Sequence, residues 1–134
     1  MIRSILAVIG GLAAGFFVIY LLELIGRGIY PSPEGLNMND PEAVRQHIEN
    51  APAGTLLMII LAHFAGTFAA VFASIKTDNG NKMAGYIAGG LLLAGTIANL
   101  IMIPHPGWFS VADPLGSILG GFIAIKLIGN KKQA

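Results

Sequence analysis

The chain has 134 residues, of which 54% are hydrophobic and only 11% are charged. A soluble domain normally carries about 25% charged residues, so this chain lacks the polar surface that a water-soluble globule needs. Its net charge of +1 and its few basic residues argue against a nucleic-acid partner. The lipid bilayer is therefore the expected environment, and the absence of cysteine excludes disulfide and thiolate chemistry.

The first apolar segment predicts a membrane-spanning helix over residues 4–26. Its run of about 20 residues is long enough to cross a bilayer. It is also longer than the apolar core of a cleaved signal peptide, about 7–15 residues, so we expect it to be retained. Glu23 is the one charged residue inside the run, and Arg27 follows it at a spacing that permits an ion pair along the helix.

A proline-stiffened turn and a short helix are expected next. The prolines of YPSPEG prevent helix formation there. In the segment NDPEAVRQHIEN, Asp40 suits the N-cap and Pro41 the first helical position. Val44 and Ile48 share one face, which predicts an amphipathic helix over about 41–50. Because so short a helix is unstable alone in water, we expect it to lie on the membrane surface or to cap the bundle.

Three further spans are predicted over residues 53–75, 83–103 and 112–129. The last one is marginal in length and needs Lys126 to extend its charged end towards the interface. Asp113 is followed by a proline, as Asp40 is, so we expect the last helix to begin with Asp113 as its N-cap.

Small residues spaced four apart occur in every predicted span, and such residues let helices approach closely in lipid. We therefore predict an all-α integral membrane protein, in which residues 1–134 form one four-helix bundle with a short external amphipathic helix between the first two spans. The pairs are Gly11 and Gly15, Gly66 and Ala70, Gly85 and Gly89, and Gly116 and Gly120.

The basic residues predict the orientation of the bundle. With four spans, Arg3, Lys76, Lys82 and the C-terminal lysines all fall on one side, and the other side is predominantly acidic. Positive residues in short loops mark the cytoplasmic face. Both termini are therefore expected in the cytoplasm, with the PHPGWF turn outside.

Each predicted span carries one polar group towards its external end: Glu23, His63 about 16 Å deep, Asn99 and Asp113. Such groups usually face the interior in lipid and often mark a site. Carboxylates and imidazoles also bind divalent metals such as zinc. One hypothesis is a metal or proton-coupled site formed by Glu23, His63, His105 and Asp113 and supported by Asn99, with His63, His105 and Glu23 as the metal ligands.

Each of these residues also has a purely structural interpretation. His63 would then bond a carbonyl or a hydroxyl such as that of Thr96, and Asn99 would join helices. His105 would be a turn residue, and Asp113 only a cap. No HExxH or clustered histidine spacing supports the metal hypothesis.

The segments ELIGRGIYPSPEGLNMNDPEA, PAGTLL and NLIMIPHPGWF resemble a family of small four-span bacterial inner-membrane proteins. The motifs YPxPxGL and NLxxIPHPxWF are fairly specific, and the resemblance covers nearly the whole chain. It implies a bacterial origin, the inner (cytoplasmic) membrane and the four-helix layout, but no activity or ligand. Members of that family often carry a bulky aromatic residue at the position of His63, which implies a weaker metal role there.

The leading functional hypothesis is a binding or accessory membrane protein with a polar pocket that opens on the external side. Glu23, Asn99 and His105 would line the pocket, with Asp113 and Trp108. Glu23 would carry charge, His105 would titrate near neutral pH and Asn99 would orient the ligand.

Three alternatives remain open. One is a homo-oligomeric small transporter or channel for a metal ion or a proton, because four short helices make a poor pore alone. A purely structural role is another. A membrane enzyme is the least favoured class, since it would need two histidines and a carboxylate to converge. A divalent metal is the one cofactor that these residues suggest.

Overall fold

The computed structural model describes residues 1–131, which form helices and no β-strand. Four helices of this part of the chain are long and apolar enough to cross a membrane, which confirms the all-α class and the four-helix bundle. The short amphipathic helix lies where it was predicted. The elements are α1 (Ile2–Ile29), α2 (Pro41–Glu49), α3 (Ala53–Thr77), α4 (Lys82–Met102) and α5 (Gly107–Lys131).

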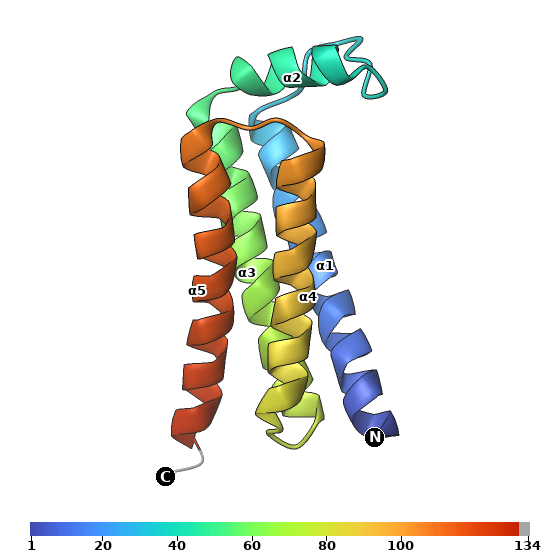
Figure 1. The fold of residues 1–134 in the computed structure, drawn as a ribbon, viewed down its shortest axis with the longest axis vertical. Coiled ribbons are helices and arrows are strands. Elements are labelled where there is room, and N and C mark those ends of the chain that lie inside the picture. Colours follow the sequence, from blue (N-terminus) through green and yellow to red (C-terminus); the bar gives the residue numbers. More distant parts are fainter. Residues whose placement is uncertain (132–134) are drawn as a thin grey trace.

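The four long helices run side by side, and α2 lies across one end of them (Figure 1). At the centre, α3 contacts α1, α4 and α5, while α4 also contacts both α1 and α5. The start of α1, the α3–α4 turn and the end of α5 gather at the end opposite α2 (Figure 1). The order of elements thus puts α3 in contact with every other long helix.

Glycines allow the close approach of α3 to its neighbours on two sides. A Cβ atom at Gly15 of α1 would lie 2.8 Å from both the Ala70 Cβ and the Gly66 carbonyl oxygen of α3. On the other side, a Cβ at Gly120 of α5 would collide with the Phe64 carbonyl. Since these contacts are to backbone or to a methyl group, they leave no room for a side chain. Helix α3 therefore packs closely against both α1 and α5.

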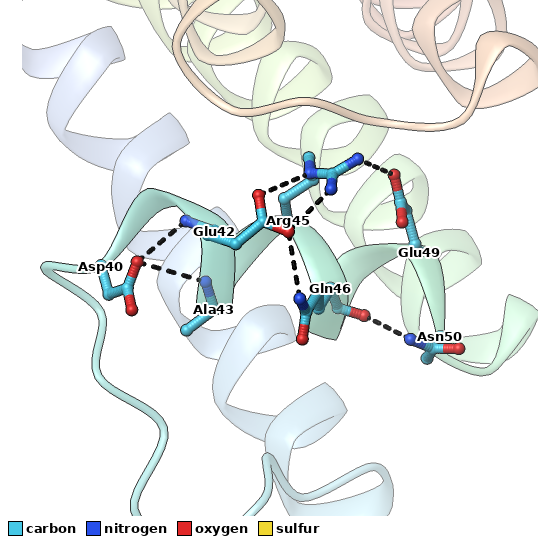
Figure 2. A network of polar contacts seen from close by, with 7 residues as sticks. All are labelled: Asp40, Glu42, Ala43, Arg45, Gln46, Glu49 and Asn50. Carbon is cyan, nitrogen blue, oxygen red and sulfur yellow. Dashed lines mark hydrogen bonds and ion pairs between the residues drawn. The ribbon is translucent and has the colours of Figure 1, made fainter.

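Helix α2 is held together by its own polar side chains (Figure 2). The Asp40 carboxylate accepts hydrogen bonds from the backbone N–H groups of Glu42 and Ala43 at 3.0 and 3.4 Å, as expected of the N-cap. The Arg45 guanidinium lies 2.7 Å from Glu42 and 3.0 Å from Glu49. These bonds from Arg45, followed by one from Gln46, lower the pKa of Glu42 from 4.5 to about 2.

Arg3 ties the start of α1 to the turn between α3 and α4. Its guanidinium donates to the Thr77 carbonyl at 2.9 and 3.1 Å and to Asn79 Oδ1 at 2.6 Å, and it lies 3.9 Å from the Asp78 carboxylate. Asn81 in turn donates to Asp78 at 2.7 Å. The turn that carries several of the charges at this end is therefore ordered by contacts between its own residues and Arg3.

The predicted start of the last helix is wrong. Helix α5 begins at Gly107, so Asp113 lies inside it and does not cap it, and Pro114 is also internal. The helix starts earlier because the Pro106 carbonyl accepts bonds from the N–H groups of Phe109 and Ser110 at 3.0 and 3.1 Å. The helix thus starts directly after Pro106 and not at Pro114. Pro114 is tolerated inside the helix at the loss of one backbone donor.

Candidate functional site

A histidine and an aspartate meet in the interior of the bundle, between α3 and α5. His63 Nδ1 lies 2.8 Å from Asp113 Oδ1 and 3.0 Å from Oδ2. The Asp113 side chain is fully buried, and the His63 side chain is 13% exposed. A carboxylate without water nearby requires a partner of this kind, because an isolated buried charge is very unfavourable.

The glycines of α5 bring these two side chains into reach. Gly116 and Gly120 follow Asp113 by about one and two helical turns, on the same side of α5. They face Ile60 and Phe64, which flank His63 on α3. An aspartate side chain is short, so it reaches across to an imidazole only where two helix backbones approach this closely. The small residues and the polar pair are therefore one structural unit.

The pair has a defined chemistry. The Asp113 oxygens accept, so Nδ1 of His63 carries a hydrogen and donates it. The other ring nitrogen, Nε2, then either carries a lone pair or a second hydrogen. In the first state the pair has a net charge of −1, and in the second it is neutral overall. The pair is thus able to take up and release one proton at Nε2.

A layer of hydroxyl groups lies one helical turn away from the pair. Thr96 Oγ1 of α4 lies 3.3 Å from Ser117 Oγ of α5, and both side chains are buried. Ser117 follows Asp113 by one turn, as Thr67 follows His63 on α3. Sequence reasoning gave Thr96 as a possible partner of His63; the structure instead pairs Thr96 with Ser117 and His63 with Asp113.

Glu23 and Asn99 do not join this polar layer. Glu23 pairs with Arg27 at 3.5 Å on its own helix and is 31% exposed. The half-buried Asn99 makes no side-chain hydrogen bond with any residue of the described range 1–131, although its carbonyl accepts from the Ile103 N–H at 3.0 Å. The ion pair follows from the i,i+4 spacing of Glu23 and Arg27.

His105 and Trp108 form an aromatic cluster around Phe109 at the start of α5. The His105 ring stacks on Phe109 with centroids 4.7 Å apart, and Trp108 meets Phe109 edge-on at 6.0 Å. Nδ1 of His105 donates to the Ile103 carbonyl at 2.6 Å. Phe109 itself is fully buried. His105 is therefore held by a turn carbonyl and an aromatic ring, and no hydrogen bond in residues 1–131 connects it with Glu23 or Asn99.

The predicted metal ligands are not gathered around one point. Within residues 1–131, no three histidine, cysteine, aspartate or glutamate side chains lie close enough together to hold a metal ion. Of the hypothesised set, His63 contacts Asp113, His105 contacts a backbone carbonyl, and Glu23 contacts Arg27.

A hollow of about 550 Å³ at the α2 end lies between α2 and the turn that precedes it. Polar side chains that line it include Glu34, Asn37 and His47. None of the residues predicted to form an external pocket is among its lining residues, which come from 31–52.

Sequence reasoning places His63 and Asp113 in one hypothetical metal or proton-coupled site with Glu23 and His105, but it does not predict their direct hydrogen bond. The Asp113–Pro114 sequence predicts Asp113 as the N-cap of the last helix, outside the bundle interior. Once α5 begins at Gly107, Asp113 lies about 9 Å into its helix and His63 about 15 Å into α3. The difference between these two depths is about 6 Å, much smaller than with a helix that begins at Pro114, and this smaller difference is the signal that would have found the pair.

Comparison of the chain with protein-family models, with curated proteins and with solved structures gives no match. The resemblance to four-span bacterial proteins therefore stays a prediction.

Proposed function

We propose that the chain is a multi-pass protein of the bacterial inner membrane, with both termini in the cytoplasm and α2 on the external face. The gathering of Arg3, Lys76, Lys82 and Lys126 towards one end of the bundle supports this orientation. At the other end, α2 is amphipathic, and its arginine is neutralised by two glutamates.

Within this placement the protein acts as a small binding protein, and the His63–Asp113 pair is its proton-binding site. The observation that carries this proposal is a fully buried carboxylate 2.8 Å from an imidazole whose second nitrogen makes no hydrogen bond within residues 1–131. The protein is thus still proposed to be a binding or accessory protein, but its proposed site is the interior pair and not a pocket at the external turn.

Protonation affects the packing of the helices because the pair is what joins α3 to α5 electrostatically. With His63 protonated, the two opposite charges attract each other and the interior carries no net charge. When the proton leaves, the Asp113 carboxylate remains as an uncompensated charge in a medium where such a charge is costly. Loss of the proton is therefore expected to loosen the α3–α5 contact.

No other titratable group competes for this role in the neighbouring helices. Helix α4 has none between Tyr86 and its end at Met102. On α1, Tyr20 makes no side-chain hydrogen bond within residues 1–131, and Glu23 is paired with Arg27. On α5, Lys126 lies about 20 Å further along the helix than Asp113. A proton taken up at this depth therefore resides on the His63–Asp113 pair.

Binding is favoured over transport because the glycine contacts pack α3 tightly against α1 and α5. A path across the membrane would have to lie between copies of the chain, and not inside one bundle.

The only tryptophan of the chain, Trp108, reports on this site. It lies on α5 about one and a half turns before Asp113 and contacts the buried Phe109. For the purified protein in detergent micelles, we expect its fluorescence to change in one step when the pH is varied, as the His63–Asp113 pair takes up or releases its proton. His63→Gln and Asp113→Asn should abolish the step.

The matched control is His105→Gln, because His105 is a second imidazole and stacks on the phenylalanine that Trp108 contacts. The step should survive in this variant. If His105→Gln removes the step while His63→Gln leaves it, the proton-binding site is not the interior pair, and the proposal fails.

A further inference from the structure

An open groove runs along the side of the bundle between α4 and α5, with α3 as its floor. Its volume is about 280 Å³, whereas a cavity of about 150 Å³ is enough for one benzene ring. The floor residues Thr67 and Val71 are buried, and the rim residues Tyr86, Ile118 and Phe122 are about half exposed. The groove therefore opens sideways, away from the centre of the bundle.

Glycines form much of the groove and keep it open. Gly90 has nothing within 4 Å of the position that a Cβ would take, so the space above it is free. Gly85 and Gly89 differ, because they already pack against Ile75 and Val71 of α3. These two glycines line the groove as well, so the groove is the part of the glycine face of α4 that α3 leaves uncovered.

The groove begins near the basic end of the bundle. Along α5 it extends from Ser117 to Ile125, about 12 Å, and Lys126 follows directly. The Lys126 ammonium lies 4.9 Å from the centre of the Phe122 ring, which forms part of the groove wall. Lys82, the first residue of α4, lies at the same end. The apolar groove therefore ends next to the positive charge of Lys126.

We propose that this groove is a binding site for an anionic phospholipid, with one acyl chain between α4 and α5 and the phosphate at Lys126. The inference rests on the membrane placement proposed above. A lipid fits both parts of the surface, because an acyl chain matches the apolar walls and an acidic headgroup matches the lysine. A helix from a second copy fits less well, since Gly85 and Gly89 of the glycine face that would receive it already pack against α3.

Native mass spectrometry of the detergent-purified protein with added phosphatidylglycerol or phosphatidylcholine, matched in acyl chains, tests the proposal. We expect the wild type to retain more phosphatidylglycerol. Lys126→Gln should lower that preference about fivefold, the effect of one basic residue near an anionic headgroup. Gly90→Leu should fill the groove and reduce the retention of both lipids.

Two matched variants control for general effects. Gly95→Leu adds the same side chain to α4 at a glycine that also has open space but does not line the groove. Lys76→Gln removes a lysine that lies over a phenylalanine, Phe72, at the same end of the bundle. Both should bind lipid like the wild type.

The proposal is overturned if Gly90→Leu retains both lipids like the wild type, or if Lys126→Gln keeps the full preference. It is equally overturned if the spectra show a dimer that Gly90→Leu abolishes, because a second copy then fills the groove. Loss of the lipid preference with an intact Trp108 pH step would remove this inference alone. Lipid selectivity in a protein without that step would remove only the proton site.

Discussion

At the scale of single residues, the interior of this bundle depends on one carboxylate and its partner. Asp113 is fully buried on a helix that has no other acidic residue in the described range 107–131. Its two oxygens both contact the imidazole of His63. Removing either partner leaves the other in a place where water cannot replace it, whereas an amide in place of the carboxylate preserves the hydrogen bond without the charge.

Asp113→Ala should therefore be much more destabilising than Asp113→Asn. Breaking a buried pair by removing one partner costs about 3–5 kcal/mol. We expect a loss of this size for Asp113→Ala, and a smaller one for Asp113→Asn, in denaturant unfolding followed by circular dichroism in micelles. Equal losses in the two variants would contradict this expectation, because they would show that a hydrogen bond without the charge contributes nothing to the contact.

Gly120 tests how closely α5 approaches α3. An added methyl group would meet the Phe64 carbonyl, which is backbone and cannot move aside. Gly120→Ala should therefore destabilise the bundle by about 1–3 kcal/mol, the usual cost of overpacking. Gly95→Ala, at a glycine with open space, should be neutral or slightly stabilising in the same unfolding measurement because alanine favours the helix. A stable Gly120→Ala variant would contradict the packing described here.

At the scale of elements, the sequence was most informative where a residue type has one structural use. The apolar runs predicted the four long helices, and Asp40 with Pro41 predicted the start of α2. The start of α5 was missed because proline can either begin a helix or be tolerated inside one, and the hydrogen bonds of the Pro106 carbonyl that start the helix cannot be seen in the sequence. The contact between His63 and Asp113 was missed for the same reason, since the depth of Asp113 within its helix depends on where α5 begins.

The pH dependence of α2 follows from its ion pairs. The pKa of Glu42 is lowered to about 2, so its stabilising contribution is complete above the ordinary value of 4.5 and is lost as the pH falls towards 2. We expect the protection of the α2 amide protons in hydrogen exchange, corrected for the intrinsic exchange rate, to be complete above about pH 4.5 and to fall progressively between 4.5 and 2. In Arg45→Gln the protection should be lower above pH 4.5 and should fall much less below it; an unchanged profile would exclude Arg45 as the cause.

At the scale of the whole molecule, the two ends of the bundle are built differently. One end carries α2, which lies across the bundle and is stabilised by bonds within itself (Figure 2). At the other end, Arg3 connects the first residues of the chain with the turn that follows α3. The overall layout could be predicted from hydropathy and charge. This connection could not, because it joins residues that are 74 and 76 positions apart.

Arg3→Ala should loosen this end without unfolding the bundle. The Arg3 side chain is 57% exposed, so the contribution of its ion pair to global stability is expected to be below about 1 kcal/mol. Hydrogen exchange should accelerate in the first turn of α1 and in the α3–α4 turn, while the α3–α5 contact stays protected. Lys82→Ala, which removes a charge at the same end, serves as the control. Faster exchange throughout the chain in Arg3→Ala would contradict a local role.

The central position of α3 bears on how the chain is made. Ribosomal synthesis proceeds from the N-terminus, so α3 emerges before α5, and His63 is already in the nascent protein when Asp113 leaves the exit tunnel. In the proposed membrane placement, Asp113 is the residue of α5 that is most unfavourable in lipid, and its partner His63 has been synthesised before it. Insertion of that helix would then be assisted by a segment translated earlier, and a nascent chain lacking His63 would hold its last helix less firmly in the bilayer.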